Sequence, residues 1–171
     1  MRSLRLPIIL IAAIAGFGTA ARADEACTPM KWDVTHERAL FSGSPRAIAA
    51  GQDTGAAPAL LPDALYEVAL EPQDKVTLAV PPGGRARTQG VFAGLARLQI
   101  TAAGTYRIAL AAPGWIDVLG EHGALAAGEH AGGGCDAPHK IVQFDLPPGE
   151  FVLQLSSVGA SRIRLTVTRA P

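Results

Sequence analysis

A strict alternation of apolar and polar side chains in the second half of the chain is the feature that most constrains its fold. The apolar members of three alternating runs are Tyr106, Ile108 and Leu110, then Phe151, Leu153 and Leu155, and finally Ile163, Leu165 and Val167. Successive side chains of an extended strand point to opposite faces, so one face of each run packs on a core and the other faces water. Strands of this kind are typical of antiparallel sheets. The sequence therefore predicts an all-β domain.

Weaker alternation elsewhere adds further strands, each bounded by turn residues. The additional apolar faces fall within 66–70, 76–80, 96–100, 115–118 and 142–146. Proline presets a turn conformation and glycine tolerates positive φ, so the segments 81–84, 113–114 and 147–149 mark places where strands end. Seven or eight strands at intervals of roughly 8 to 12 residues predict a β-sandwich or a β-barrel.

The stretch before the first strand has a different pattern. Residues 33–41 predict one short helix, with Asp33 as its N-cap and Glu37 in its first turns. We expect Leu40 and Phe41 to pack on the sandwich. Residues 42–63 are rich in Ser, Gly, Pro and Ala, which predicts a loop with room for one edge strand.

The N-terminus has the order of a secretory signal peptide. Arg2 and Arg5 precede an apolar run of about a dozen residues, and 21–23 form a small-x-small cleavage site. A transmembrane anchor needs roughly 18 to 20 continuous apolar residues, and neither this run nor any later one is that long. We therefore predict that residues 1–23 are removed. Residues 24–171 are then one periplasmic or secreted domain, with no membrane insertion.

Removal of the signal peptide makes the chain acidic. It takes away three arginines and no acidic residue, so the 15 basic residues become 12 against 15 acidic ones. No basic stripe is left to neutralise phosphates, and this argues against a nucleic-acid partner.

The chain has two cysteines, Cys27 and Cys135. An even pair in an exported protein predicts a disulfide. Closing a loop of about 100 residues stabilises a fold by on the order of 4 to 5 kcal/mol in the chain-entropy model. A reactive or metal-bound thiol is the alternative.

The segment from the Pro113-Gly114 turn to Lys140 has the densest set of chemically versatile side chains. His122, His130, Cys135 and His139 lie in it, together with several carboxylates. Imidazole, thiolate and carboxylate are the usual ligands of zinc or iron, so one hypothesis is a metal site. The spacing His-x7-His-x4-Cys-x3-His matches no zinc pattern, and a disulfide at Cys135 would remove one ligand. The other hypothesis is a solvated loop.

Trp115 and Asp117 alternate with two aliphatic residues in this segment. If the aliphatic residues face the core, Trp115 lies on the other face beside a carboxylate, where it would stack on a sugar or a peptide. The alternative is that Trp115 covers one end of the core.

No catalytic motif stands out. A Gly-x-Ser-x-Gly elbow is absent, and the Gly-rich run 132–134 is followed by no Lys-Ser/Thr pair. Asp117, Glu121 and Glu129 are candidates for a glycosidase pair, but the sequence does not fix their separation. We assign no catalytic residue, cofactor or metal from the residues alone.

Two resemblances follow from longer stretches. The runs Gly104-Thr-Tyr-Arg-Ile-Ala-Leu, Trp115-Ile-Asp-Val, Lys140-Ile-Val-Gln-Phe-Asp-Leu-Pro-Pro-Gly and Phe151-Val-Leu-Gln-Leu-Ser resemble the bacterial pre-peptidase C-terminal domain. This resemblance covers about the last 70 residues. It implies a jelly-roll-like sandwich and an accessory or binding role beside secreted enzymes.

The second resemblance spans nearly the whole mature chain. The stretch Cys27-Thr-Pro-Met-Lys-Trp-Asp-Val-Thr-His-Glu-Arg-Ala-Leu-Phe, with Leu65-Tyr-Glu-Val-Ala-Leu, Gly114-Trp-Ile-Asp-Val and His139-Lys-Ile-Val, is similar to a family of small secreted proteobacterial proteins of unknown function. Some members are labelled homogentisate 1,2-dioxygenase, which implies non-haem iron. The His-x-His with a following Glu that binds iron in cupins is absent, so no iron ligand is carried over.

We therefore predict an antiparallel, jelly-roll-like β-sandwich with a short N-terminal helix and a Cys27–Cys135 disulfide. Its role is binding or accessory, and its partner is a protein, a peptide or a carbohydrate. The candidate binding residues are Trp115, Asp117, His122, His130 and His139. The alternative is a metal-dependent enzyme, such as a non-haem iron dioxygenase, that uses the three histidines.

Overall fold

The computed structural model describes residues 29–82, 89–133 and 135–171. The predicted signal peptide, residues 1–23, lies outside the described residues and stays a prediction. Within the described ranges, the structure contains no helix with the length and hydropathy that crossing a membrane requires.

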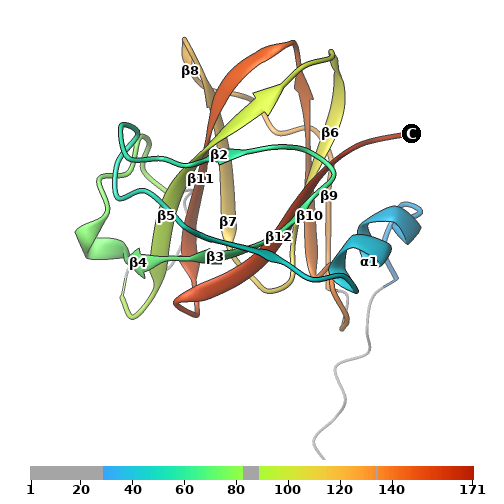
Figure 1. Cartoon of the computed structure of the whole chain (residues 1–171), viewed down its shortest axis with the longest axis horizontal. Helices are drawn as coiled ribbons and strands as arrows, with labels where there is room; N and C mark the ends of the chain where they lie inside the picture. The colour runs from blue at the N-terminus through green and yellow to red at the C-terminus, as the bar shows by residue number, and fades with distance from the viewer. Residues whose placement is uncertain (1–28, 83–88, 134) are drawn as a thin grey trace, which may run out of the picture.

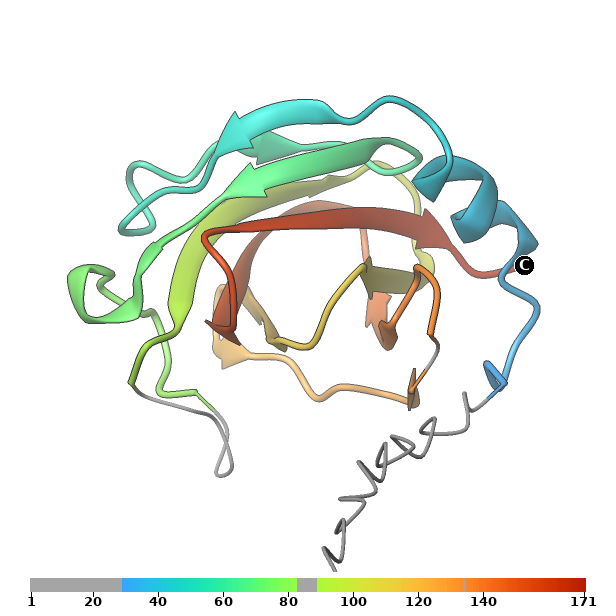
Figure 2. The ribbon, with the colours of Figure 1, turned by 90° about the horizontal axis from the view of Figure 1, so that it is seen from below.

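The strands of the described chain form two sheets that pack face to face. Sheet A has the order β1 (Arg46–Ala49), β3 (Leu65–Ala69), β12 (Arg162–Arg169), β6 (Gly104–Leu110), β10 (Lys140–Leu146) and β9 (His130–Gly132). Sheet B has the order β2 (Ala59–Leu60), β5 (Phe92–Ile100), β11 (Gly149–Val158), β7 (Trp115–Gly120) and β8 (Gly123–Ala124), and β4 (Glu71–Pro72) pairs with β5. Figure 1 shows the two layers from one side, and Figure 2 shows them enclosing the interior.

The strand order is that of a jelly roll. When β3, β5, β6, β7, β8, β10, β11 and β12 are counted along the chain, sheet A runs first, eighth, third, sixth, and sheet B runs second, seventh, fourth, fifth. Such a double Greek key places neighbouring strands far apart in sequence. The predicted jelly-roll-like β-sandwich is therefore confirmed. Two short strands in the 42–63 stretch, β1 and β2, extend the sheets by parallel pairing where one edge strand was expected.

The core lies between the sheets and is built from the alternating apolar faces. Its fully buried members include Ile108, Leu110, Leu153, Leu165 and Val167. Period-two alternation put these side chains on one face of each strand, as the sequence predicts. Burial of a Leu or Ile side chain of this kind contributes roughly 1.5 to 3 kcal/mol.

Helix α1 (Thr35–Phe41) packs on the outer face of sheet A. Val34 and Phe41 are buried there against Leu65, Ala109 and Ile141. The prediction that Asp33 is the N-cap is wrong, because Val34 holds that position. The Asp33 carboxylate accepts hydrogen bonds from the backbone N–H and the hydroxyl of Thr35 at 2.9 and 2.7 Å. These bonds form a short side-chain-to-backbone turn just before the helix. The helix therefore starts later than predicted.

The predicted strand at 76–80 is also wrong. A 3₁₀ turn, η1 (Gln73–Lys75), precedes this segment, and residues 76–80 join no sheet. Val76 is buried and Thr77 is exposed, so the alternation in the sequence does report burial. The backbone is held by other groups: Thr77 N–H donates to Gln52 O at 2.8 Å, and Ala79 N–H donates to the side chain of Gln154. The segment thus lies across the outer face of sheet B instead of pairing with a strand.

Candidate functional site

Trp115 and Asp117 lie side by side on the outer face of sheet B. Both belong to β7, where Ile116 and Val118 point into the core and leave the alternate residues outside. The indole Nε1 of Trp115 donates a hydrogen bond to Asp117 Oδ1 at 3.0 Å. Both side chains are half-buried, so the structure brings together two of the predicted binding residues.

Gln154 holds Asp117 in place from the neighbouring strand β11. Its Nε2 donates to Asp117 Oδ2 at 3.1 Å and to Val80 O at 2.9 Å. Its Oε1 accepts from the backbone N–H groups of Ala79 at 2.8 Å and Val80 at 3.3 Å. The amide is fully buried and uses all the hydrogen bonds that its two donors and its acceptor oxygen allow. It therefore fixes both the carboxylate and the segment that crosses the sheet.

Lys140 reaches the same cluster from the other sheet. It begins β10 opposite Leu110 in sheet A, and its Nζ donates to Gly114 O at 2.7 Å. The same Nζ lies 5.2 Å from the centroid of the Trp115 ring, within the range of a cation–π interaction. Lys140 therefore links the two sheets at this end of the sandwich. The sequence gives no signal that singles out this lysine, because its position depends on how the two sheets pack against each other.

Burial shifts the pKa values of both charged groups in this cluster, Asp117 and Lys140. Burial raises the pKa of the Asp117 carboxyl above its ordinary value, although the hydrogen bonds from Trp115 and Gln154 and the charge of Lys140 oppose that rise. Burial lowers the pKa of Lys140, and the charge of Asp117 opposes this. Asp117 and Lys140 form no direct ion pair in the described structure. Each charge is therefore partly desolvated.

The three predicted histidines lie at different places. His122 is exposed in the turn between β7 and β8, at the opposite end of β7 from Trp115. His130 is exposed at the start of β9, and His139 is half-buried next to Lys140. Throughout 29–82, 89–133 and 135–171, no three His, Cys, Asp or Glu side chains converge as a metal site would require. The hypothesis of a metal bound by these histidines thus has no support in the described structure.

The predicted disulfide cannot be placed. Cys135 is exposed in the loop before β10, whereas Cys27 lies outside the described residues. The Cys27–Cys135 pairing stays a prediction.

A second polar cluster, under α1, was not predicted. Glu37 is buried and accepts hydrogen bonds from Thr168 Oγ1 at 2.7 Å and from Arg107 Nη1 at 3.4 Å. Arg107 is also buried, and its guanidinium lies 5.3 Å from the centroid of the Trp32 ring. Alternation placed Arg107 on an outer face, but only the tertiary position of α1 shows that this part of the face is covered.

No family model matches the chain, and no curated protein matches it. Among solved structures, the chain is similar to the pre-peptidase C-terminal domain of a collagenase from Bacillus anthracis, with 11% sequence identity and a TM-score of 0.40. The match covers 73% of this chain and 99% of that domain. This is the type of domain that the sequence of the last strands resembles.

Proposed function

We propose that the chain is an exported binding module that holds a carbohydrate on the outer face of sheet B, with Trp115 as the stacking surface. The observation that carries the proposal is the indole of Trp115, fixed outside the core by the Asp117 carboxylate at 3.0 Å. Tryptophan combines a large apolar ring with a polar edge and is a common anchor in binding surfaces.

The surroundings of Trp115 suit a ligand that is both flat and rich in hydroxyl groups. A sugar ring presents C–H groups to an aromatic face and hydroxyl groups at its rim. The rim would meet a carboxylate acceptor at Asp117, which is only partly buried. Gln154 holds Asp117 before any ligand arrives, which lowers the cost of ordering the site on binding.

Export is supported by the order of charged, apolar and small residues at the N-terminus. Binding outside the cytoplasm also fits a mature chain with more acidic than basic residues. Such a chain carries no excess positive charge to neutralise the phosphates of a nucleic acid. Export is tested by N-terminal sequencing of protein recovered from the periplasm and the medium, which should start at Asp24. A free-thiol count on the same sample should find none. Recovery of the protein with Met1 intact in the cytoplasm would contradict export.

The binding proposal is tested on glycan and peptide arrays with the exported protein. We expect wild type to bind a defined group of glycans, Trp115→Phe to bind them more weakly, and Trp115→Ala to lose them. Wild type that binds peptides but no glycan would replace the sugar in the proposal with a peptide. A Trp115→Ala variant that keeps wild-type binding would remove Trp115 from the site.

A further inference from the structure

Strand β9 forms a free edge of sheet A. It pairs with β10 on one side, and within the described residues no strand pairs with its other side. His130 and Gly132 are exposed, whereas Ala131 between them is buried. The two exposed residues of β9 therefore lie on an edge that is open to solvent.

The hydrogen bonds to β10 show which main-chain groups face this edge. Gln143 N–H donates to Glu129 O at 2.9 Å, and Gly133 N–H donates to His139 O at 3.1 Å. Antiparallel strands exchange hydrogen bonds at every second residue, so the two exposed residues of β9 point their N–H and C=O groups away from β10. None of the described residues bonds to these groups. The edge therefore offers main-chain donors and acceptors to another strand.

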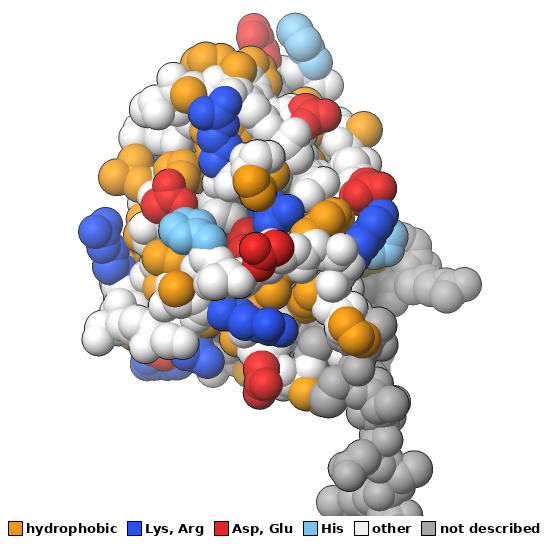
Figure 3. All heavy atoms as spheres, turned by 90° about the vertical axis from the view of Figure 1, so that its right-hand side faces the viewer, with side chains coloured by type: hydrophobic (Ala, Val, Ile, Leu, Met, Phe, Trp, Pro, Cys, Tyr) orange, Lys and Arg blue, Asp and Glu red, His pale blue; other side chains and the backbone are white. Residues whose placement is uncertain are grey.

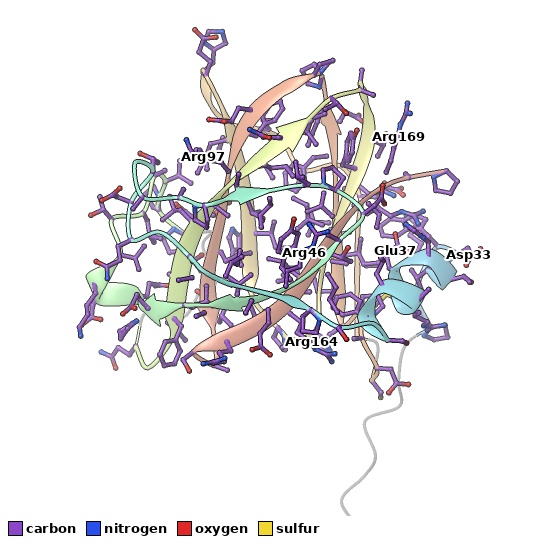
Figure 4. The ribbon with its side chains drawn as sticks, in the orientation of Figure 1. Asp33, Glu37, Arg46, Arg97, Arg164 and Arg169 are labelled. Carbon is purple, nitrogen blue, oxygen red and sulfur yellow. The ribbon has the colours of Figure 1, made fainter. Side chains whose placement is uncertain are left out.

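The other sheet edges carry features that hinder such pairing. The outer strands of sheet B, β2 and β8, are two residues long. At the far edge of sheet A, β1 follows Pro45 and begins with the exposed Arg46 (Figure 4). Very short strands, basic side chains and proline keep edge strands from pairing with other chains. Residues 129–133 follow β10 throughout and contain no proline, lysine or arginine.

The fold of a single copy does not require glycine at position 132. A Cβ at Gly132 would meet only His139 O, at the ordinary contact distance of 3.7 Å, and the φ of this residue is not in the left-handed region. Glycine within a strand weakens it, because it has no side chain to pack. Gly133 differs, because its φ of 94° favours glycine. The space beside Gly132 is thus left open without a reason in the single copy.

A second copy of the chain fits this edge in an antiparallel register. When the two Ala131 residues face each other across a two-fold axis, His130 lies opposite Gly132 of the second copy. In the same register Glu129 lies opposite Gly133 of the second copy. Each longer side chain then meets a glycine, and no two like charges are directly opposite. The outward N–H and C=O groups become the hydrogen-bonded pairs of this register.

The charges near the edge also permit association of two copies. Glu129 forms an ion pair with Lys31 of its own chain at 2.7 Å. Figure 3 shows the side of the molecule that carries α1, where basic and acidic side chains are interspersed. A surface of mixed charge produces no potential of a single sign that would keep two copies apart.

We infer that two copies of this chain form a dimer in which their β9 edges pair antiparallel around Ala131 and join the two A sheets into one continuous sheet. Two-fold dimers are the commonest symmetric assemblies, and this pairing uses the same edge of both copies, so it closes at two. The interface is short, so the dimer belongs to the weak class that dissociates on dilution. Trp115 takes no part in the pairing, and the inference does not rest on carbohydrate binding.

Sedimentation equilibrium of the mature protein, residues 24–171, tests the association. The mass of wild type should rise from that of one chain toward that of two as the protein concentration increases to about 1 mM. Gly132→Thr should raise the dimer Kd at least about tenfold, because its side chain fills the space opposite His130. The single copy has room for that side chain at its Cβ.

The matched control is Gly159→Thr, in the turn between β11 and β12. Gly159 is exposed, and a Cβ there would have no atom within 4 Å. Its dimer Kd should stay within about twofold of the wild-type value. Both variants should unfold at the wild-type temperature when dilute, which separates a lost interface from a lost fold.

Hydrogen exchange locates the interface. The amides of His130 and Gly132 should become protected as the protein concentration rises, while the Ala131 amide, which faces β10, is protected at every concentration. A protein that stays monomeric to about 1 mM would overturn the inference. So would a dimer in which the two outward amides stay unprotected, or a Gly132→Thr dimer of wild-type affinity. Protection of these amides in the monomer would also overturn it, since another part of the same chain would then cover the edge.

Discussion

The two outer faces of the sandwich each carry a tryptophan, a cation over its ring and a carboxylate. On sheet A these are Trp32, Arg107 and Glu37. On sheet B the tryptophan is Trp115, the carboxylate is Asp117, and Lys140 lies over the indole ring. The first set lies under α1, where the side chains of Arg107 and Glu37 are 7% and 2% exposed. No helix of the described residues lies over the second set, and its charged groups are half-buried.

On our proposal, this difference separates a structural cluster from a binding surface. A buried carboxylate and guanidinium that satisfy each other leave little for a ligand, and removing either one leaves an uncompensated charge. A half-buried carboxylate and ammonium that are held in place but not paired keep part of their interaction energy for a partner. If the proposal holds, the same three types of side chain have different roles because α1 covers only one of the two sets.

Removal of Glu37 should give the largest effect on stability. Glu37→Ala leaves Arg107 buried without its carboxylate, and we expect the free energy of unfolding to fall by about 3 to 5 kcal/mol. Chemical denaturation measures the change. The control is Glu67→Ala, which breaks the exposed ion pair with Arg162 and should cost at most about 1 kcal/mol. Equal losses in the two variants would show that α1 does not seal a structural cluster.

Loss of the Gln154 side chain, on the outer face of sheet B, should give the next largest decrease in the free energy of unfolding. Gln154→Ala leaves backbone groups of Ala79 and Val80 without partners, so we expect a loss of about 2 kcal/mol. Limited proteolysis should also cut faster within 76–80. Gln99→Ala, at an exposed position on β5, serves as the control and should change neither measurement. Unchanged proteolysis in Gln154→Ala would mean that other contacts hold the crossing segment.

The smallest effect is the pH dependence that Asp117 contributes. Its pKa is raised in the folded protein, so its contribution to stability is complete below the unfolded pKa and is lost as pH rises through the folded pKa. NMR titration of the Asp117 carboxyl should give a pKa above that of an ordinary aspartate. Unfolding measured over the same pH range should show a slightly smaller loss in Asp117→Asn than in wild type. A carboxyl pKa below the ordinary value would show that hydrogen bonds outweigh burial.

The sequence predicts the core of this fold well because alternation is a local property. The inward residues of β6, β11 and β12 could be read directly from their spacing. At 76–80 the same alternation reports burial without a strand, because the side chain of Gln154 takes the hydrogen bonds that a neighbouring strand would supply. A pattern of burial does not reveal which partner satisfies the backbone.

The candidate site was predicted only in part, for a related reason. Trp115 and Asp117 are two residues apart on one strand, so their contact follows from the pleat. Lys140 and Gln154 come from other strands, and their positions depend on register and sheet order. His122 and His130 are close to Trp115 in sequence, but extended strands and turns carry them away from it.

The most direct test compares the two tryptophans by two measurements on the same proteins, glycan binding and the free energy of unfolding. Trp32 packs against the apolar cluster under α1, whereas Trp115 stands outside the core clusters. We predict that Trp32→Ala lowers stability and keeps glycan affinity, while Trp115→Ala abolishes glycan binding with a smaller loss of stability. If both variants lose stability equally and neither loses affinity, the two clusters do not differ in function and the account is contradicted.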